Sequence, residues 1–216
     1  MSSSELVIEP PLRGYWAIYN PPGHPPLAFD FLAVDEHKSL YRKGGFLRHL
    51  VSSIPVDDTH TWSRPVFSPV DGIVVASHDA EDDRKRISFL YDLLLLLINK
   101  PKVSSGFQAF GGNHIMIRCG NVFVLLCHLR KGSSRVRAGD AVTVGQEVAE
   151  VGNSGSSIQP HLHLQVMSSD RYFPLFANLL PFKLSRGKLK RDGSWTIQQN
   201  FELQNRGHYE FESRQA

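Results

Sequence analysis

The sequence predicts a mostly β protein, built as an antiparallel β-sheet sandwich or a partly open barrel, with one short helical insertion. Its 17 glycines and 13 prolines divide the chain into short apolar stretches, as is typical of strands joined by tight turns. Several of these stretches alternate polar and apolar residues, which is the period of a half-buried strand. The helical insertion is expected around residues 84–99, where a long apolar run replaces the alternation.

Seven stretches between turn signals are expected to be strands, because they are rich in β-branched and aromatic residues. In chain order they are 15–20, 27–34, 72–78, 113–119, 122–129, 147–152 and 161–167. The insertion over 79–110 separates the third from the fourth and contains five successive leucines. Past residue 183, apolar residues at strand spacing predict a further β-hairpin; they are Trp195, Ile197, Phe201 and Leu203.

A length of 216 residues suits one domain with appendages. We expect an N-terminal tail over 1–13 and a β domain over 14–182, with the insertion inside it. Residues 183–216 are expected to form a C-terminal β-hairpin extension of the same domain.

The dipeptide Gly120-Asn121 is typical of a two-residue turn that closes a hairpin. With this turn, residues whose numbers add to 241 stand opposite each other. His128 then faces Asn113 on the face of Leu126 and Ile115, and His114 faces Cys127 on the other face. The register therefore predicts that His114 lies off the functional face, unless a bulge shifts it.

Composition excludes several classes of protein. Lys and Arg number 24 against 21 Asp and Glu, an excess too small to indicate a nucleic-acid partner. The two cysteines, Cys119 and Cys127, lie too far apart along the hairpin to pair. The apolar run 87–98 contains Asp92 and is too short to span a bilayer, so no transmembrane segment is expected.

The first residues, MSSSELVIEPPLRG, lack the basic and apolar regions of a signal peptide. We therefore expect a periplasmic or extracellular location only for a chain trimmed of its export signal, and a cytoplasmic one otherwise.

Two features point to a metal or a reaction centre. In the alternating stretch PHLHLQV, His161 and His163 share one face of a strand and the leucines take the other. Paired imidazoles suit a metal ion or a shared reaction centre, although solvent-facing histidines are the plainer interpretation. Asp30, between Phe29 and Phe31, needs a partner in so apolar a segment. That partner is either a metal ion or an Arg or Lys side chain.

The run GNHIMI…VFVLLCHLRKGSSRVRAGDAVTVGQEVAEVGNSGSSIQPHLHLQV (112–166) resembles the lysostaphin-type zinc metalloendopeptidases, which cut peptide bridges in bacterial cell walls. The strand FSPVDGIVVAS (67–77) is similar to the strand that precedes this run in the family. The resemblance covers about 15–182. It implies the duplicated hybrid motif fold and hydrolysis of peptidoglycan stem or cross-bridge peptides by a zinc-activated water.

By position, the resemblance implies one zinc ion held by His24, Asp30 and His163. His128 and His161 match the two non-ligand histidines, which act on the attacking water and on the developing oxyanion. Three protein ligands leave a fourth tetrahedral position for water, as catalytic zinc requires.

One departure concerns the first ligand. The family usually has three residues between its first histidine and the aspartate, whereas five separate His24 from Asp30. The prolines after His24 could form a turn that preserves the geometry. Alternatively, His37 in VDEHKS takes the place of His24.

Other functions stay open at this stage. Some members of the family lose the metal and act as binding or regulatory modules for cell-wall hydrolases. The stretch GDAVTVGQEV (139–148) also suggests a phosphocarrier or lipoyl-like domain, but these need facing histidines without an aspartate, or a lysine at a hairpin tip. The leucine-rich run over 87–98 is expected to pack on the core, or else to form a homodimer contact or a lid.

Overall fold

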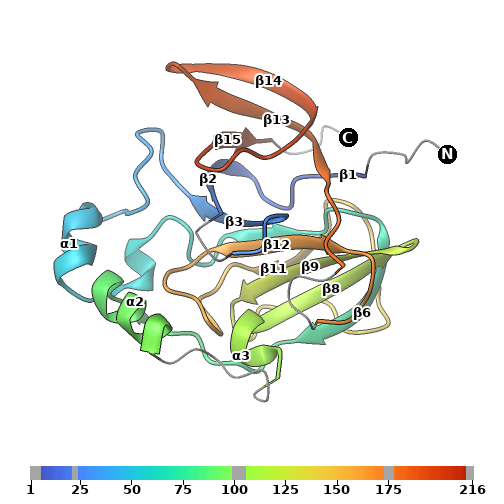
Figure 1. Cartoon of the computed structure of the whole chain (residues 1–216), viewed down its shortest axis with the longest axis horizontal. Helices are drawn as coiled ribbons and strands as arrows, with labels where there is room; N and C mark the ends of the chain where they lie inside the picture. The colour runs from blue at the N-terminus through green and yellow to red at the C-terminus, as the bar shows by residue number, and fades with distance from the viewer. Residues whose placement is uncertain (1–5, 21–23, 99–105, 173–177, 213–216) are drawn as a thin grey trace.

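The computed structural model describes residues 6–20, 24–98, 106–172 and 178–212, the side chains of 95–98 excepted (Figure 1). One twisted sheet of 11 strands dominates it, in the order β1-β13-β15-β2-β3-β12-β9-β8-β6-β10, with β14 paired to β13 off this path. Two small sheets pair β11 with β5 and β4 with β7. The predicted mostly β, antiparallel fold is confirmed, and the described sheets do not close into a barrel.

The strands are β1 (Val7–Ile8), β2 (Gly14–Tyr19), β3 (Ala28–Ala33), β4 (Ile54–Pro55), β5 (Pro65–Phe67), β6 (Gly72–His78), β7 (Arg86–Ile87), β8 (Asn113–Cys119), β9 (Val122–Leu129), β10 (Ala141–Val142), β11 (Glu147–Glu150), β12 (Leu162–Met167), β13 (Lys183–Arg191), β14 (Ser194–Phe201) and β15 (His208–Phe211). The helices are α1 (Gly45–Val51), α2 (Phe89–Ile98) and α3 (Gln108–Gly111), with a 3₁₀ turn over Val56–Asp58. All seven strands expected within 15–167 are present.

The insertion differs in detail from the expected helix around 84–99. Its helix, α2, begins only at Phe89, because Arg86 and Ile87 pair with Ile54 and Pro55 as strand β7. Within α2, Asp92 is buried and binds Arg84, and it accepts a hydrogen bond from the backbone N–H of Ser88. No helix of the described residues is long and apolar enough to cross a membrane.

The main core lies on one face of the large sheet. It takes the alternate residues of the central strands, such as Leu126, Leu162 and Leu164, together with Trp16 and Phe31. The residues between them in the sequence therefore point to the opposite face. That face carries His163 of β12 and the Asp30 carboxylate of β3.

The hairpin β8–β9 follows the predicted register from its turn as far as His114, which stands opposite Cys127. Beyond that point a bulge shifts the pairing, so Asn113 stands opposite Leu129 and His128 is the extra residue. His128 has a φ of 60°, in the left-handed region. The expectation that His128 faces Asn113 is therefore wrong, because the bulge re-aims its side chain.

The register across the sheet also corrects the expectation for His114. Asp30 stands opposite His163, and His163 stands opposite Cys127. Cys127 stands opposite His114, which in turn stands opposite His78. Since opposite residues on neighbouring strands share a face, His114 lies on the same face as His163. Both cysteines are free thiols, as expected.

Candidate metal centre

Two adjacent strands supply a carboxylate and an imidazole to the same point. In β3, the aromatic neighbours of Asp30 point into the core or pack against it, so the carboxylate points to the opposite face. In β12, Leu162 and Leu164 do the same for His163. The Asp30 Oδ1 and His163 Nδ1 atoms are 3.0 Å apart.

His24 reaches this point from a turn that precedes β3. The backbone N–H of Ala28 donates to the carbonyl of Pro25 at 3.2 Å, which closes a tight turn over the two prolines. This turn accommodates the five residues that separate His24 from Asp30 in the sequence. It brings His24 Nε2 to 3.1 Å from Asp30 Oδ1. His37, the alternative first ligand, is exposed in the turn after β3.

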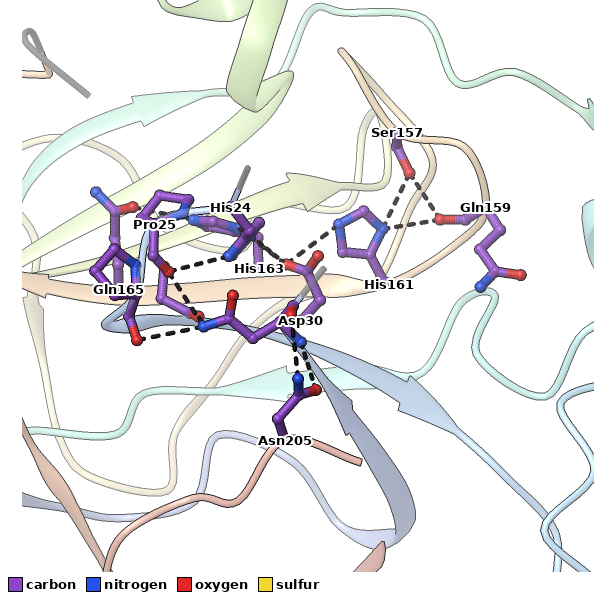
Figure 2. A network of polar contacts seen from close by, with 12 residues as sticks. His24, Pro25, Asp30, Ser157, Gln159, His161, His163, Gln165 and Asn205 are labelled. Atoms are coloured by element: carbon purple, nitrogen blue, oxygen red, sulfur yellow. Dashed lines mark hydrogen bonds and ion pairs between the residues drawn. The ribbon is translucent and has the colours of Figure 1, made fainter. Parts of the chain in front are cut away.

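The three side chains offer one donor atom each, and these atoms lie within 4.8 Å of one another. His24 Nε2 and His163 Nδ1 are 3.0 Å apart, so the three donors form a nearly equilateral triangle. Figure 2 shows the three side chains converging. About a tenth of each side chain stays accessible: 13% for His24, 12% for Asp30 and 14% for His163.

In His24 and in His163, the ring nitrogen outside the cluster donates a hydrogen bond to an oxygen atom. The Nδ1–H of His24 donates to the carbonyl of Pro25 at 3.3 Å. The Nε2–H of His163 donates to Oε1 of Gln165 at 3.0 Å. Because each ring places its proton on the nitrogen away from the cluster, the nitrogen in the cluster carries a lone pair. Hydrogen bonds of this kind fix the tautomer of metal-binding histidines.

Two further histidines border the cluster. His161 Nδ1 donates to the carbonyl of Gln159 at 2.9 Å, and the Ser157 hydroxyl lies 3.1 Å from the same nitrogen (Figure 2). The Nε2 atom of His161 lies 3.6 Å from Asp30 Oδ1. The His128 ring centroid lies 4.5 Å from that of His161, and its Nδ1 donates to the carbonyl of Ser154 at 2.9 Å.

The carbonyl that holds His128 depends on a close approach between two glycines. Gly112 and Gly155 both have positive φ, and a Cβ on Gly155 would lie 2.4 Å from the backbone nitrogen of Gly112. Next to them, the backbone N–H of Asn113 donates to the Ser154 hydroxyl at 3.0 Å. The glycines of the Gly-Asn and Gly-Asn-Ser-Gly motifs therefore let two loops touch, which fixes Ser154 beneath His128.

Electrostatics favour an ionised Asp30 carboxylate and neutral rings at His128 and His161. Burial alone would raise the pKa of Asp30, but the imidazoles of His161, His163 and His24 hold it well below its usual range. Burial, together with the neighbouring imidazoles, lowers the pKa of His128 well below that of a free histidine. Burial likewise lowers the pKa of His161, against the attraction of Asp30. The pKa of His163 is raised, because its bonds to Asp30 and Gln165 outweigh burial.

Gln165 was not predicted from the sequence as a residue of this face, and His114 was predicted to lie off it. Gln165 follows His163 at strand spacing on the same face, which is the signal that could have identified it. The Nδ1–H of His114 donates to the Gly112 carbonyl, so its Nε2 accepts from the Tyr172 hydroxyl at 3.0 Å. The His114 ring also stacks beside that of His78. Phe107 stacks on Tyr172 with ring centroids 4.2 Å apart, and both rings contact His114.

The donor set fits zinc. One carboxylate oxygen and two imidazole nitrogens are typical zinc ligands, and His/His/Asp favours zinc over magnesium or calcium. Tetrahedral zinc with bonds of about 2.0–2.1 Å requires donor atoms about 3.3 Å apart. The observed separations of 3.0–3.1 Å need only a small expansion to meet this value.

The fold and the site together describe a mostly β protein with a candidate His/Asp/His metal centre. Residues 99–174 match the sequence model of peptidase family M23. The resemblance to the lysostaphin-type peptidases is thereby confirmed over the segment that contains His128, His161 and His163. No curated protein matches the chain significantly.

Solved structures resemble the chain at a low level. The catalytic domain of lysostaphin from Staphylococcus simulans is 16% identical, with a TM-score of 0.41, covering 78% of this chain and 88% of that one. A catalytic-domain variant of the prophage-encoded M23 protein EnpA from Enterococcus faecalis is 16% identical, with a TM-score of 0.40, covering 84% and 91%. A peptidase M23 structure from Pseudomonas aeruginosa is 19% identical, with a TM-score of 0.41, covering 76% and 45%.

The chain thus spans less than half the length of the Pseudomonas protein.

Proposed function

We propose that this chain is a zinc metalloendopeptidase that hydrolyses peptide bonds in peptidoglycan stem or cross-bridge peptides. The observation that carries the proposal is the triangle of His24 Nε2, Asp30 Oδ1 and His163 Nδ1, with donor atoms 3.0–3.1 Å apart. Both imidazoles already present a lone pair to that triangle. The match of residues 99–174 to peptidase family M23 supports the choice of substrate class.

Zinc at this site would polarise a scissile carbonyl and lower the pKa of a bound water toward neutrality. Three protein donors leave a tetrahedral position open for that chemistry, and Asp30 brings the negative charge that offsets part of the metal's charge. The limited exposure of the three side chains keeps the cluster reachable by a substrate, while the surrounding protein strengthens its electrostatics.

We assign the handling of protons to His161 and His128. Each ring donates its Nδ1–H to a backbone carbonyl, so each Nε2 carries a lone pair. Their lowered pKa values keep both rings neutral at neutral pH, as a general base must be. One ring accepts the proton of the attacking water and passes it to the leaving amine. A ring that carries a proton can donate to the developing oxyanion.

The test is the metal content of purified protein, by elemental analysis, for wild type and His163→Ala in parallel. We expect about one zinc per chain in the wild type and none in the variant, since two donors do not form a closed site. His37→Ala, which removes an exposed imidazole outside the cluster, is the matched control and should keep the metal. Cleavage of peptidoglycan peptides should then follow the zinc content.

A wild type that takes up no zinc at neutral pH, even with excess metal, would contradict the proposal. The chain would then be better explained as an inactive family member that binds or regulates cell-wall hydrolases. The long interval between His24 and Asp30 favoured that alternative, but the Pro25–Ala28 turn accommodates it. We therefore keep the enzyme as the proposed function.

Location and assembly complete the proposal. Action on a wall peptide places the protein in the periplasm or outside the cell.

We also propose that α2, in the 87–98 segment, contacts a second copy of the chain. Its residues Leu90, Tyr91 and Leu94 are each more than half exposed, so the described part of the helix does not bury them in its own domain.

A further inference from the structure

The turn that carries His24 is held by a side chain from the end of β2. The Asn20 side-chain amide donates to the carbonyls of Pro25, Pro26 and Ala28, at 3.3, 3.2 and 3.3 Å. The single side-chain amide of Asn20 thus forms hydrogen bonds with three carbonyls of the turn. One of these, the Pro25 carbonyl, also accepts the Nδ1–H of His24 at 3.3 Å.

Asn20 is itself held by the C-terminal segment. The Asn20 backbone N–H donates to Oδ1 of Asn205 at 3.0 Å, and Nδ2 of Asn205 donates to the Asn20 carbonyl at 3.2 Å. This two-bond pairing fixes the backbone of Asn20 where β2 ends. Figure 2 marks these two hydrogen bonds at Asn205.

The loop that carries Asn205 is in turn fastened to β2. The backbone N–H of Arg206 donates to the carbonyl of Ile18 at 2.8 Å, and the Ile18 N–H donates to the carbonyl of Gly207 at 2.9 Å. The loop then leads into β15, which pairs with β2. Asn205 is therefore presented from a fixed backbone, although its side chain is exposed.

We infer that Asn205 and Asn20 are positioning residues of the metal centre, and that the C-terminal extension is part of that centre. Their hydrogen bonds run without a gap from Asn205 to Asn20, to the Pro25 carbonyl and to His24. Of the three ligands, His163 and Asp30 lie in central strands, whereas His24 lies in a turn outside regular structure. A ligand on a turn needs external support to keep its geometry, because loops hold side chains less firmly than strands do.

This inference rests on the proposed function, and the test measures zinc binding rather than activity. The zinc dissociation constant would be determined by competition with a chelating indicator, for wild type, Asn20→Asp and Asn205→Ala. Asn20→Asp keeps the size of the side chain but removes both donors. We expect each variant to bind zinc about tenfold more weakly, within the range known for outer-shell partners of metal ligands.

The control for the amide-to-carboxylate change is Asn200→Asp, at an exposed position of β14 in the same extension. This variant should bind zinc like the wild type. The double variant Asn20→Asp/Asn205→Ala should lose no more than the worse single variant, because the two residues act in series. Thermal melts of all the variants would show that they fold.

Two results would overturn the inference in different ways. Wild-type zinc affinity in both folded single variants would overturn it alone and leave the proposed function standing. A wild type that binds no zinc would overturn the proposed function and the inference together.

Discussion

At the scale of single residues, the proton of each histidine at the centre is directed by an oxygen acceptor. For His24, His128 and His161 a backbone carbonyl accepts the bond. For His163 the acceptor is the Gln165 side chain, which can be changed by substitution. The Nε2 of Gln165 lies 2.9 Å from the sulfur of Met167, so its oxygen is turned toward His163.

We predict that Gln165→Met weakens zinc binding by about 10- to 100-fold, because the acceptor that keeps the His163 proton on Nε2 is lost. Methionine fills a similar volume, so packing in this buried position should change little. Gln165→Glu keeps an acceptor oxygen and should bind zinc at least as tightly as the wild type. Competition with a chelating indicator measures the zinc affinities of the wild type, Gln165→Met and Gln165→Glu, and so gives their order.

The control for this substitution is Gln159→Met, since Gln159 serves His161 through its backbone carbonyl and not through its side chain. Equal zinc affinity for Gln165→Met and Gln159→Met would show that the Gln165 amide has no part in orienting His163.

The sequence predicted the strand face of Asp30 and His163, but not the direction of the His128 side chain. Strand alternation was enough to place Asp30 and His163 opposite the core, because it is a local property of the chain. The direction of the His128 side chain depends on a bulge and a positive φ, and its Nδ1–H bonds the Ser154 carbonyl, which is distant in the sequence. The support of His24 by Asn205 joins residues far apart in sequence, and no local pattern encodes it.

At the scale of elements, α1 and α2 form a small helical unit beside the sheet (Figure 1). The Phe46 and Phe89 rings meet edge to face at 5.7 Å, and His49 lies between the helices and is almost fully buried. The Tyr41 hydroxyl lies 2.6 Å from Nδ1 of His49, and burial raises the pKa of Tyr41 to about 12. The sequence did not predict α1, since it is a seven-residue helix that follows two glycines.

The buried imidazole predicts a loss of stability in acid. Burial lowers the pKa of His49 in the folded state, so the unfolded chain binds a proton more readily. Its contribution to stability is therefore complete above the unfolded pKa of about 6.5, and it is lost as the pH falls toward the folded value. Urea unfolding at about pH 7.5 and pH 5.5 should show a lower midpoint in acid.

The variant His49→Phe should make this pH dependence shallower, although it also removes the bond to Tyr41 at a cost of about 1 kcal/mol. Some dependence should remain, because burial also lowers the pKa of His114. If His49→Phe has the same pH dependence as the wild type, the acid sensitivity arises elsewhere.

At the scale of the whole molecule, the fold class was predictable because dense turn signals and short alternating stretches leave few other architectures. The order of the strands was not, because β13 and β15 insert between β1 and β2 from the far end of the chain. This insertion buries Leu184, Tyr209 and Phe211 in the main core. Strands β13 and β15 thus share the main core with the strands that carry Asp30 and His163.

Among the described residues, α1 and α2 carry apolar side chains that stay exposed. Those that are 52–73% exposed are Phe46, Leu47, Val51, Leu90, Tyr91 and Leu94. Leu47 and Val51 lie one helical turn apart, as do Leu90 and Leu94, so each pair lies on one side of its helix. Exposed apolar surfaces of this kind commonly mark protein interfaces, and a contact between two copies would be the same patch on both.

We predict that the wild type sediments as a concentration-dependent mixture of monomer and dimer, and that Leu90→Glu/Leu94→Glu sediments as a monomer. The two carboxylates would have to be buried in the contact, which costs more free energy than a weak dimer provides. Ile197→Glu, on a β14 side chain that is 75% exposed, is the matched control and should keep the dimer. Sedimentation velocity over a wide range of concentrations measures all three proteins. A wild type that stays monomeric throughout would mean that α1 and α2 expose these side chains for something other than a second copy.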